Sequence, residues 1–134
     1  MRVFFDTNVL VSAFTARGLS ADVFRLALVE HEVVTGEVNL VELERVLRDR
    51  MKAPASTVRT VLTLLREQQV VPKPAAPVDL PIRDPDDAWV LASAIAGKAD
   101  LVVTGDKDLL TLGAVSPIPI LDPRGFWELV RTGP

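Results

Sequence analysis

The sequence of 134 residues contains no cysteine and no tyrosine, and its single histidine is His31. The lack of cysteine excludes disulfide bonds, thiolate zinc sites and cysteine nucleophiles. A lone histidine excludes a metal centre built on several imidazoles. No apolar run reaches eighteen residues, so the sequence predicts no membrane-spanning helix. The apolar N-terminal stretch carries Asp6 and Asn8 and lacks a small-residue cleavage site, which is unlike a signal peptide. We therefore expect a cytoplasmic protein.

The composition is typical of a globular protein, with 49% hydrophobic and 25% charged residues. The length predicts a single domain over residues 1–134. A mean hydropathy of +0.28 is high for a small chain and indicates more apolar surface than a monomer hides easily, which predicts a homodimer.

The charge is unevenly placed along the chain. The segment 84–108 holds six aspartates and two lysines, a charge of −4, whereas the rest holds 13 basic and 12 acidic residues, a charge of +1. These totals predict no broad basic face for nucleic acid. Eleven of the fifteen basic residues are arginine, the better side chain for bidentate phosphate contacts.

Short apolar segments alternate with segments of helical periodicity. The pattern predicts strands at residues 3–5, 33–34, 70–71, 101–103 and 118–121. It predicts helices at residues 8–14, 20–30, 37–50, 54–69, 85–96 and 123–131. The proline-rich stretch 72–85 is expected to be an extended loop. Apolar strands between helices predict an α/β fold, a three-layer α/β/α sandwich around a parallel sheet of about five strands.

Several local details follow from the same periodicity. We expect Ser20 to cap the second helix and Gly97 to end the helix 85–96. In the helix 37–50, Leu40, Leu43, Leu47 and Met51 form a stripe that faces the core. Glu44 pairs with Arg48 on the solvent-exposed face.

Asp6 and Asp106 each lie at or just after the end of a predicted strand. Asp6 comes after the first strand, and Asp106 follows the strand 101–103 in the run Thr104-Gly105-Asp106-Lys107-Asp108. Ligands of open parallel sheets bind at the carboxyl ends of strands, so both acids are candidate metal ligands. The alternatives are that Asp6 only caps the next helix and that Asp106 and Asp108 are ordinary turn residues.

Two further acidic segments lie on predicted helices. Glu42 falls between Val38 and Val46 on one helix face, where a carboxylate is partly desolvated unless a cation or an ordinary salt bridge compensates it. In Asp84-Pro85-Asp86-Asp87, Asp84 can cap a helix that begins at Pro85, and the helix dipole favours the next two acids. Three acids nevertheless exceed what capping requires.

Four segments thus each offer an acid at a strand end or a helix. Carboxylates brought together in one cleft raise one another's pKa values and destabilise the fold unless a cation neutralises them. Oxygen-only ligands suit Mg²⁺ or Mn²⁺.

Nearly the whole chain resembles the PIN domain family, in the branch of VapC-like toxins. The resemblance is carried by Val3 to Leu10, by Glu42 to Leu47, by Arg83 to Ala88 and by Val103 to Leu110, in this order. It implies a parallel sheet flanked by helices and an endoribonuclease dependent on Mg²⁺ or Mn²⁺. It also implies an RNA substrate, a cognate antitoxin that silences the toxin of a type II pair, and a homodimer.

Matched residue by residue, the resemblance implies that the four catalytic acids, which are also the metal ligands, are Asp6, Glu42, Asp87 and Asp106. Asp86 competes with Asp87 for the third place, and Asp108 assists near the metal. Thr7, Asn8 and Thr104 resemble the polar companions of these acids.

Two other functions compete with the nuclease. A catalytically idle PIN-like domain would serve as a binding module, although the four acids are intact. A phosphoacceptor signalling domain needs a pair of acids after the first strand and a lysine after the last. The sequence has Thr7-Asn8 after Asp6 and Asp122-Pro123-Arg124 after residue 121, so it fits that function poorly.

Overall fold

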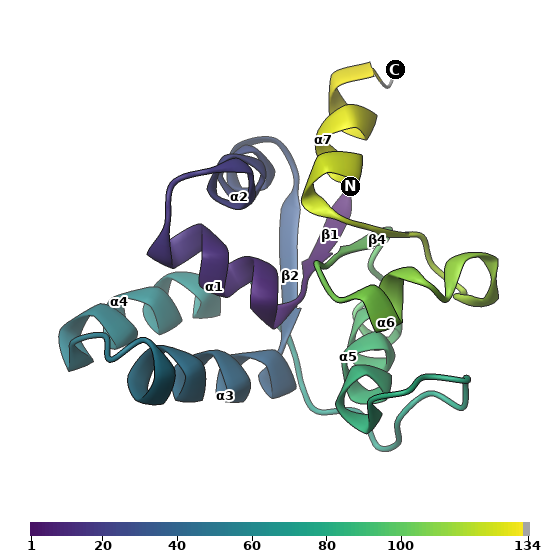
Figure 1. The fold of residues 1–134 in the computed structure, drawn as a ribbon, viewed down its shortest axis with the longest axis horizontal. Helices are drawn as coiled ribbons and strands as arrows, with labels where there is room; N and C mark the ends of the chain where they lie inside the picture. Colours follow the sequence, from purple (N-terminus) through teal and green to yellow (C-terminus); the bar gives the residue numbers. More distant parts are fainter. Residues whose placement is uncertain (133–134) are drawn as a thin grey trace.

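The computed structural model describes residues 1–132, which fold around one five-stranded sheet (Figure 1). The order across the sheet is β3-β2-β1-β4-β5, and every neighbouring pair is parallel. The strands are β1 (Arg2–Phe5), β2 (Glu32–Gly36), β3 (Gln69–Val71), β4 (Leu101–Val103) and β5 (Ile120–Leu121). The predicted parallel sheet is therefore confirmed.

Helices connect the strands on both faces of the sheet. They are α1 (Thr7–Thr15), α2 (Leu19–Glu30), α3 (Glu37–Arg45), the π-helix η1 (Val46–Arg50), α4 (Ala55–Arg66), α5 (Pro85–Ala96), α6 (Lys107–Leu110), the 3₁₀ helix η2 (Gly113–Val115) and α7 (Pro123–Thr132). The sequence predicted a turn where α6 forms, because a helix of one turn has too few residues to show a period.

Alternate residues of the strands build two cores. Val3 and Phe5 of β1 face one core, which is covered by α1, α2, α3, α4 and α7. Phe4 of β1 and Val102 of β4 face the other core, which is covered by α5 and α6. Figure 1 shows α1, α2, α3 and α4 on one side of the sheet and α5 and α6 on the other. The predicted three-layer α/β/α arrangement follows from this period of two along each strand.

The helix predicted over residues 37–50 is not regular. It changes to a π-helix at Val46, where Met51 N donates to Val46 O at 2.9 Å. The wider turn shifts the following residues around the axis, so Met51 is 47% exposed and does not join the leucine stripe. The predicted pair of Glu44 and Arg48 is likewise replaced by Arg48 Nε donating to Asp49 Oδ1 at 3.0 Å.

Three other boundaries differ from the prediction. Helix α2 begins at Leu19 after Gly18, whose φ of 146° only glycine readily adopts, so Ser20 lies inside the helix. Helix α4 ends at Arg66, not at residue 69. Strand β5 begins at Ile120 because Pro119 has no N–H to give the ladder. Within residues 1–132, no helix has both the length and the apolar character needed to cross a membrane.

Gly97 ends α5 as predicted, but for another reason than the usual left-handed turn. Its φ is −79°, and the left-handed residue is Lys98, with a φ of 55°. A Cβ on Gly97 would lie 2.5 Å from Val71 Cγ2 and 3.2 Å from Val34 Cγ1. The glycine is therefore required by the close packing of the helix end on β2 and β3.

Gly97→Ala is expected to lower the free energy of unfolding by about 1–3 kcal/mol, because the added methyl group overpacks the contact with Val71. Lys98→Gly removes the side chain from a left-handed residue and should leave stability unchanged or raise it by up to about 1 kcal/mol. Urea denaturation of both variants measures the difference. An alanine variant as stable as the Lys98→Gly protein would contradict the packing argument.

Candidate metal centre

The candidate site lies where the path of the chain through the sheet changes direction. From β1 the chain runs outward to β2 and β3, and it then returns to the other side of β1 to form β4 and β5. The crevice between β1 and β4 is thus the switch point of the sheet, the usual ligand site of this architecture. Asp6 follows β1 and Thr104 follows β4, so the topology brings them together at the carboxyl edge.

Asp6 is held rigidly at this edge. Its side chain is 5% exposed. Oδ1 accepts hydrogen bonds from Thr7 N at 2.8 Å and Asn39 Nδ2 at 3.2 Å, and Oδ2 accepts one from Thr104 Oγ1 at 2.7 Å. Burial raises the pKa of Asp6, and these hydrogen bonds oppose the rise. Asp6 also caps α1, so the capping alternative is compatible with a place in the site.

Thr104 and Asn8 connect the start of α1 to the turn after β4. Besides donating to Asp6, the Thr104 hydroxyl accepts a hydrogen bond from Asp106 N at 3.0 Å. Asn8 Oδ1 accepts one from Gly105 N at 3.1 Å. The three polar companions expected from the resemblance, Thr7 included, therefore lie beside the acids and fix their backbone.

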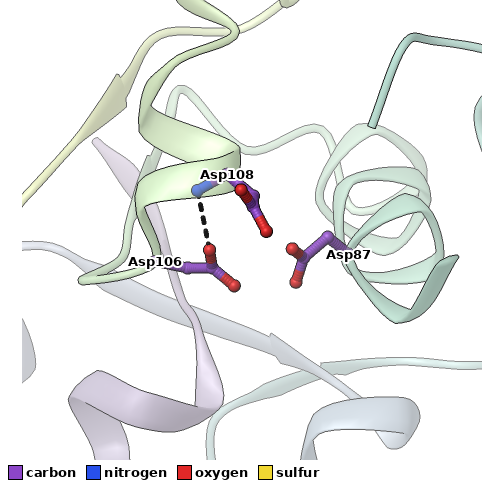
Figure 2. A group of neighbouring side chains, drawn as sticks. All are labelled: Asp87, Asp106 and Asp108. Carbon is purple, nitrogen blue, oxygen red and sulfur yellow. Dashed lines mark hydrogen bonds between the residues drawn. The ribbon is translucent and has the colours of Figure 1, made fainter. Parts of the chain in front are cut away.

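Asp87 on α5 faces Asp106 and Asp108 at the start of α6 (Figure 2). Asp87, Asp106 and Asp108 each offer a carboxylate oxygen, and these oxygens lie within 4.8 Å of one another. Asp106 caps α6 by accepting a hydrogen bond from Asp108 N at 2.8 Å. Three convergent carboxylates form an oxygen-only donor set, which suits a hard divalent cation.

Asp87 is the buried member of this group, and one of its carboxylate oxygens has no partner among residues 1–132. The side chain is 6% exposed, and its buried Oδ2 has no hydrogen-bond partner within the described part of the chain. Burial, and then the neighbouring Asp106 carboxylate, raise the pKa of Asp87 to about 8. A buried acceptor without a donor is costly, and a divalent cation would satisfy it. The residues therefore fit the metal that the sequence predicts.

The start of α5 separates the neighbouring acids into different roles. Asp84 caps the helix by accepting a hydrogen bond from Asp86 N at 3.0 Å, and Pro85 is the first helical residue. The capping role predicted for Asp84 is thus confirmed. Asp86 is exposed and lines a cavity beside Trp89, whereas Asp87 joins Asp106 and Asp108. The structure brings only the second of the two competing acids into the group.

Glu42 lies near Asp6 but outside the group of three. It is half-buried on α3, between Val38 and Val46 as predicted. Burial, and then the charge of Asp6, raise the pKa of Glu42. Within residues 1–132 it forms no ion pair shorter than 4 Å, so an ordinary salt bridge does not account for it.

A sequence model described as "PIN domain" matches residues 2–108, most of the chain. The chain belongs to the PIN domain family. No curated protein matches it significantly.

Solved structures share the fold of this PIN domain at low sequence identity. VapBC2 from Rickettsia felis, bound to a DNA fragment from their promoter, has a TM-score of 0.62 and 16% identity, and the match covers 91% of this chain and 98% of that one. FitAcB from Neisseria gonorrhoeae has a TM-score of 0.63 and 13% identity with the same coverage. PAE2754 from Pyrobaculum aerophilum has a TM-score of 0.64 and 17% identity, covering 98% and 91%.

One polar residue that shapes the PIN domain site was not among the predicted site residues. Asn39 is fully buried on α3, and its Nδ2 donates to Asp6 Oδ1 and, at 3.1 Å, to Thr7 Oγ1. An asparagine four residues before the buried Leu43 is the only signal, because it places an amide on the inward face of the helix.

Gly36 allows α3 and α5 to approach each other beneath the site. A Cβ on Gly36 would lie 3.0 Å from the Ser93 side chain and 3.1 Å from Asn39 Oδ1. This close approach sets the separation between the helix that carries Glu42 and the helix that carries Asp87. A glycine at the end of a strand is thus part of what positions the acids.

Proposed function

We propose that this PIN domain is a metal-dependent endoribonuclease that hydrolyses RNA phosphodiester bonds and acts as the toxin of a type II toxin–antitoxin pair. The observation that carries the proposal is the group of Asp87, Asp106 and Asp108, with a buried carboxylate oxygen that has no partner. Thr104 connects this group to Asp6 at the switch point of the sheet. Family membership supports nuclease chemistry at this position.

Asp87, Asp106 and Asp108 would hold Mg²⁺ or Mn²⁺, with Asp6 as a further ligand from the central strand. A bound cation supplies a water of lowered pKa and stabilises the leaving oxygen. The hydrogen bonds from Thr7, Asn39 and Thr104 keep the Asp6 carboxylate in one orientation.

Glu42 has a separate role in this proposal. It has no ion-pair partner among residues 1–132, and it borders open cavities on both sides. We assign it to accept the proton of the attacking water, a task that suits a carboxylate of raised pKa.

The test is cleavage of single-stranded RNA by the purified protein. We expect cleavage with added Mn²⁺ or Mg²⁺ and none after chelation with EDTA, with activity restored when the metal is returned. Cleavage that is indifferent to EDTA would contradict the proposal. Failure to bind Mn²⁺ in a calorimetric titration would instead favour a catalytically idle binding module.

The proposed partners are a cognate antitoxin and a second copy of the chain. The resemblance to VapC-like toxins and the shared fold with VapBC2 and FitAcB support the antitoxin, and the high mean hydropathy supports a homodimer. A toxin of this kind would act in the cytoplasm. Sedimentation at micromolar concentration measures the oligomeric state, and a monomer there would contradict the homodimer.

A further inference from the structure

Two cavities lie on either side of Glu42. The first has a volume of about 310 Å³, lies between α3 and α5, and is lined by Arg45, Lys73 and Trp89 among others. The second has a volume of about 300 Å³, lies between α1 and η1, and is lined by Asn8, Ser12 and Arg50 among others. Glu42 lines both, so the cavities meet at an acid of the candidate site.

The cations of these cavities are available to bind a ligand. Arg45, Lys73 and Arg50 form no ion pair shorter than 4 Å with any residue in the range 1–132. Five other arginines of the same range do form such pairs, namely Arg2, Arg25, Arg48, Arg66 and Arg131. Basic side chains repel metal ions, but they bind the phosphates of a polyanion.

Trp89 adds an aromatic surface to the first cavity. It is half-buried on α5, and Lys73 Nζ lies 4.7 Å from the centroid of its ring. The lysine is exposed, and its flexible stem allows the ammonium to move from the ring to a phosphate. An aromatic ring beside phosphate-binding cations is typical of sites for single-stranded nucleic acid, where an unpaired base stacks on the ring.

We propose that single-stranded RNA runs from one cavity to the other past Glu42, with phosphates bound by Arg45, Lys73 and Arg50 and one base stacked on Trp89. This deepens the proposed function and rests on it, because the path places a phosphodiester beside Glu42. A duplex is excluded, since its bases are stacked on one another and cannot reach the ring.

Trp89 itself reports on the first cavity. The chain has two tryptophans, so Trp127→Phe leaves Trp89 as the only one. Ca²⁺ replaces Mg²⁺ or Mn²⁺ in this experiment so that the RNA is bound without being cleaved. Titration with a short single-stranded oligoribonucleotide should decrease the fluorescence of Trp89 to a plateau, and the duplex of the same sequence should not. Equal quenching by the duplex would overturn the single-strand proposal. A response to an antitoxin peptide with none to RNA would assign the cavities to a polypeptide.

Substitutions separate RNA binding from the metal site. Lys73→Ala and Arg45→Ala should each raise KM roughly 5- to 20-fold and keep kcat within about twofold. Each should also reduce the slope of log K for RNA binding against log salt concentration by about 0.7 for each lost phosphate contact. Trp89→Leu should raise KM by a similar factor, and Trp89→Phe should restore it. The matched control is Arg59→Ala, on the exposed face of α4 outside both cavities.

The outcomes distinguish this inference from the proposed function. If metal-dependent cleavage occurs but Lys73→Ala matches Arg59→Ala in KM and salt slope, and Trp89 emission does not respond to RNA, the path through the cavities is wrong and the nuclease stands. If RNA quenches Trp89 and the protein never cleaves it, the nuclease is wrong and the binding site stands. The melting shift caused by Mn²⁺ should be the same in all these variants, which confirms that their acids remain in place.

Discussion

Asp6→Asn is expected to reduce kcat for RNA cleavage by about 10³-fold or more, since acids that act through a shared metal site fail together when one is removed. The amide has the shape of the carboxylate, and its oxygen can still accept from Thr7 N and Asn39 Nδ2. The substitution removes the charge beside Asp106 and the oxygen that accepts the hydrogen bond of the Thr104 hydroxyl. Cleavage rates at saturating RNA and Mn²⁺ measure the effect.

Asp122→Asn is the matched control for this prediction. Asp122 also follows a strand and precedes a helix, and its Oδ1 accepts a hydrogen bond from Gly125 N at 2.7 Å. It stands after the edge strand β5, away from the switch point. We expect this variant to cleave at the wild-type rate. If Asp6→Asn cleaves as fast as Asp122→Asn, the assignment of Asp6 to the site is wrong.

The metal-free protein is expected to lose stability as the pH rises from about 4 to about 8. The folded state keeps a proton on Asp87 up to a pKa of about 8, whereas the unfolded chain releases it near the ordinary value of 3.8. The folded state thus binds more protons throughout this window, and the free energy of unfolding falls with rising pH. The raised pKa values of Asp6 and Glu42 act in the same direction. With solvent screening included, the loss between pH 5 and pH 7.5 should be about 2 kcal/mol.

Asp87→Asn removes the cause of this loss. Without metal at pH 7.5 we expect the variant to be more stable than the wild type by about 1–2 kcal/mol, with little difference at pH 4.5. Saturating Mn²⁺ should reverse the order, because 100-fold excess over Kd stabilises the wild type by about 2.7 kcal/mol, or about 10 °C in Tm. Asp87→Asn should gain little from the metal.

Asp86→Asn is the control within the same helix turn. Asp86 is exposed and lies outside the group of three, so this variant should follow the wild type at both pH values and in Mn²⁺. Denaturant titrations with EDTA and with Mn²⁺ give all these values. A wild type whose stability is independent of pH in EDTA, or an Asp86→Asn protein that alone loses the metal response, would contradict the assignment of Asp87.

The sequence predicted strands and helices correctly where a periodic pattern of apolar residues extends over several positions. The apolar strand 3–5 predicted β1 and the position of Asp6 at its end, and the order of elements predicted the parallel sheet. The start of the helix at Pro85 was predicted, but the run of acids at residues 84–87 did not show which carboxylate turns inward, because that depends on how α5 packs against the rest of the fold. In the structure Asp86 is exposed and Asp87 is buried.

Other features depend on contacts between segments distant in the sequence. The role of Asn39 comes from its hydrogen bond to Asp6, 33 residues earlier, and the role of Gly36 comes from its approach to Ser93. The π-turn at Val46 and the left-handed Lys98 depend on how a helix end packs. None of these features produces a periodic pattern of apolar residues in the neighbouring sequence, so the sequence pattern does not predict them.

The place of β4 beside β1 decides when the candidate site can form during synthesis of the chain. Thr104, which fixes Asp6, and Asp106 come about 100 residues after β1, yet β4 is the immediate neighbour of β1. In a nascent chain that has left the ribosome only as far as α5, Glu42 and Asp87 lie in α-helices. Asp6 then follows a strand that has not yet paired with β4. The candidate site therefore cannot form until β4 and Asp106 have been translated and β4 has paired with β1.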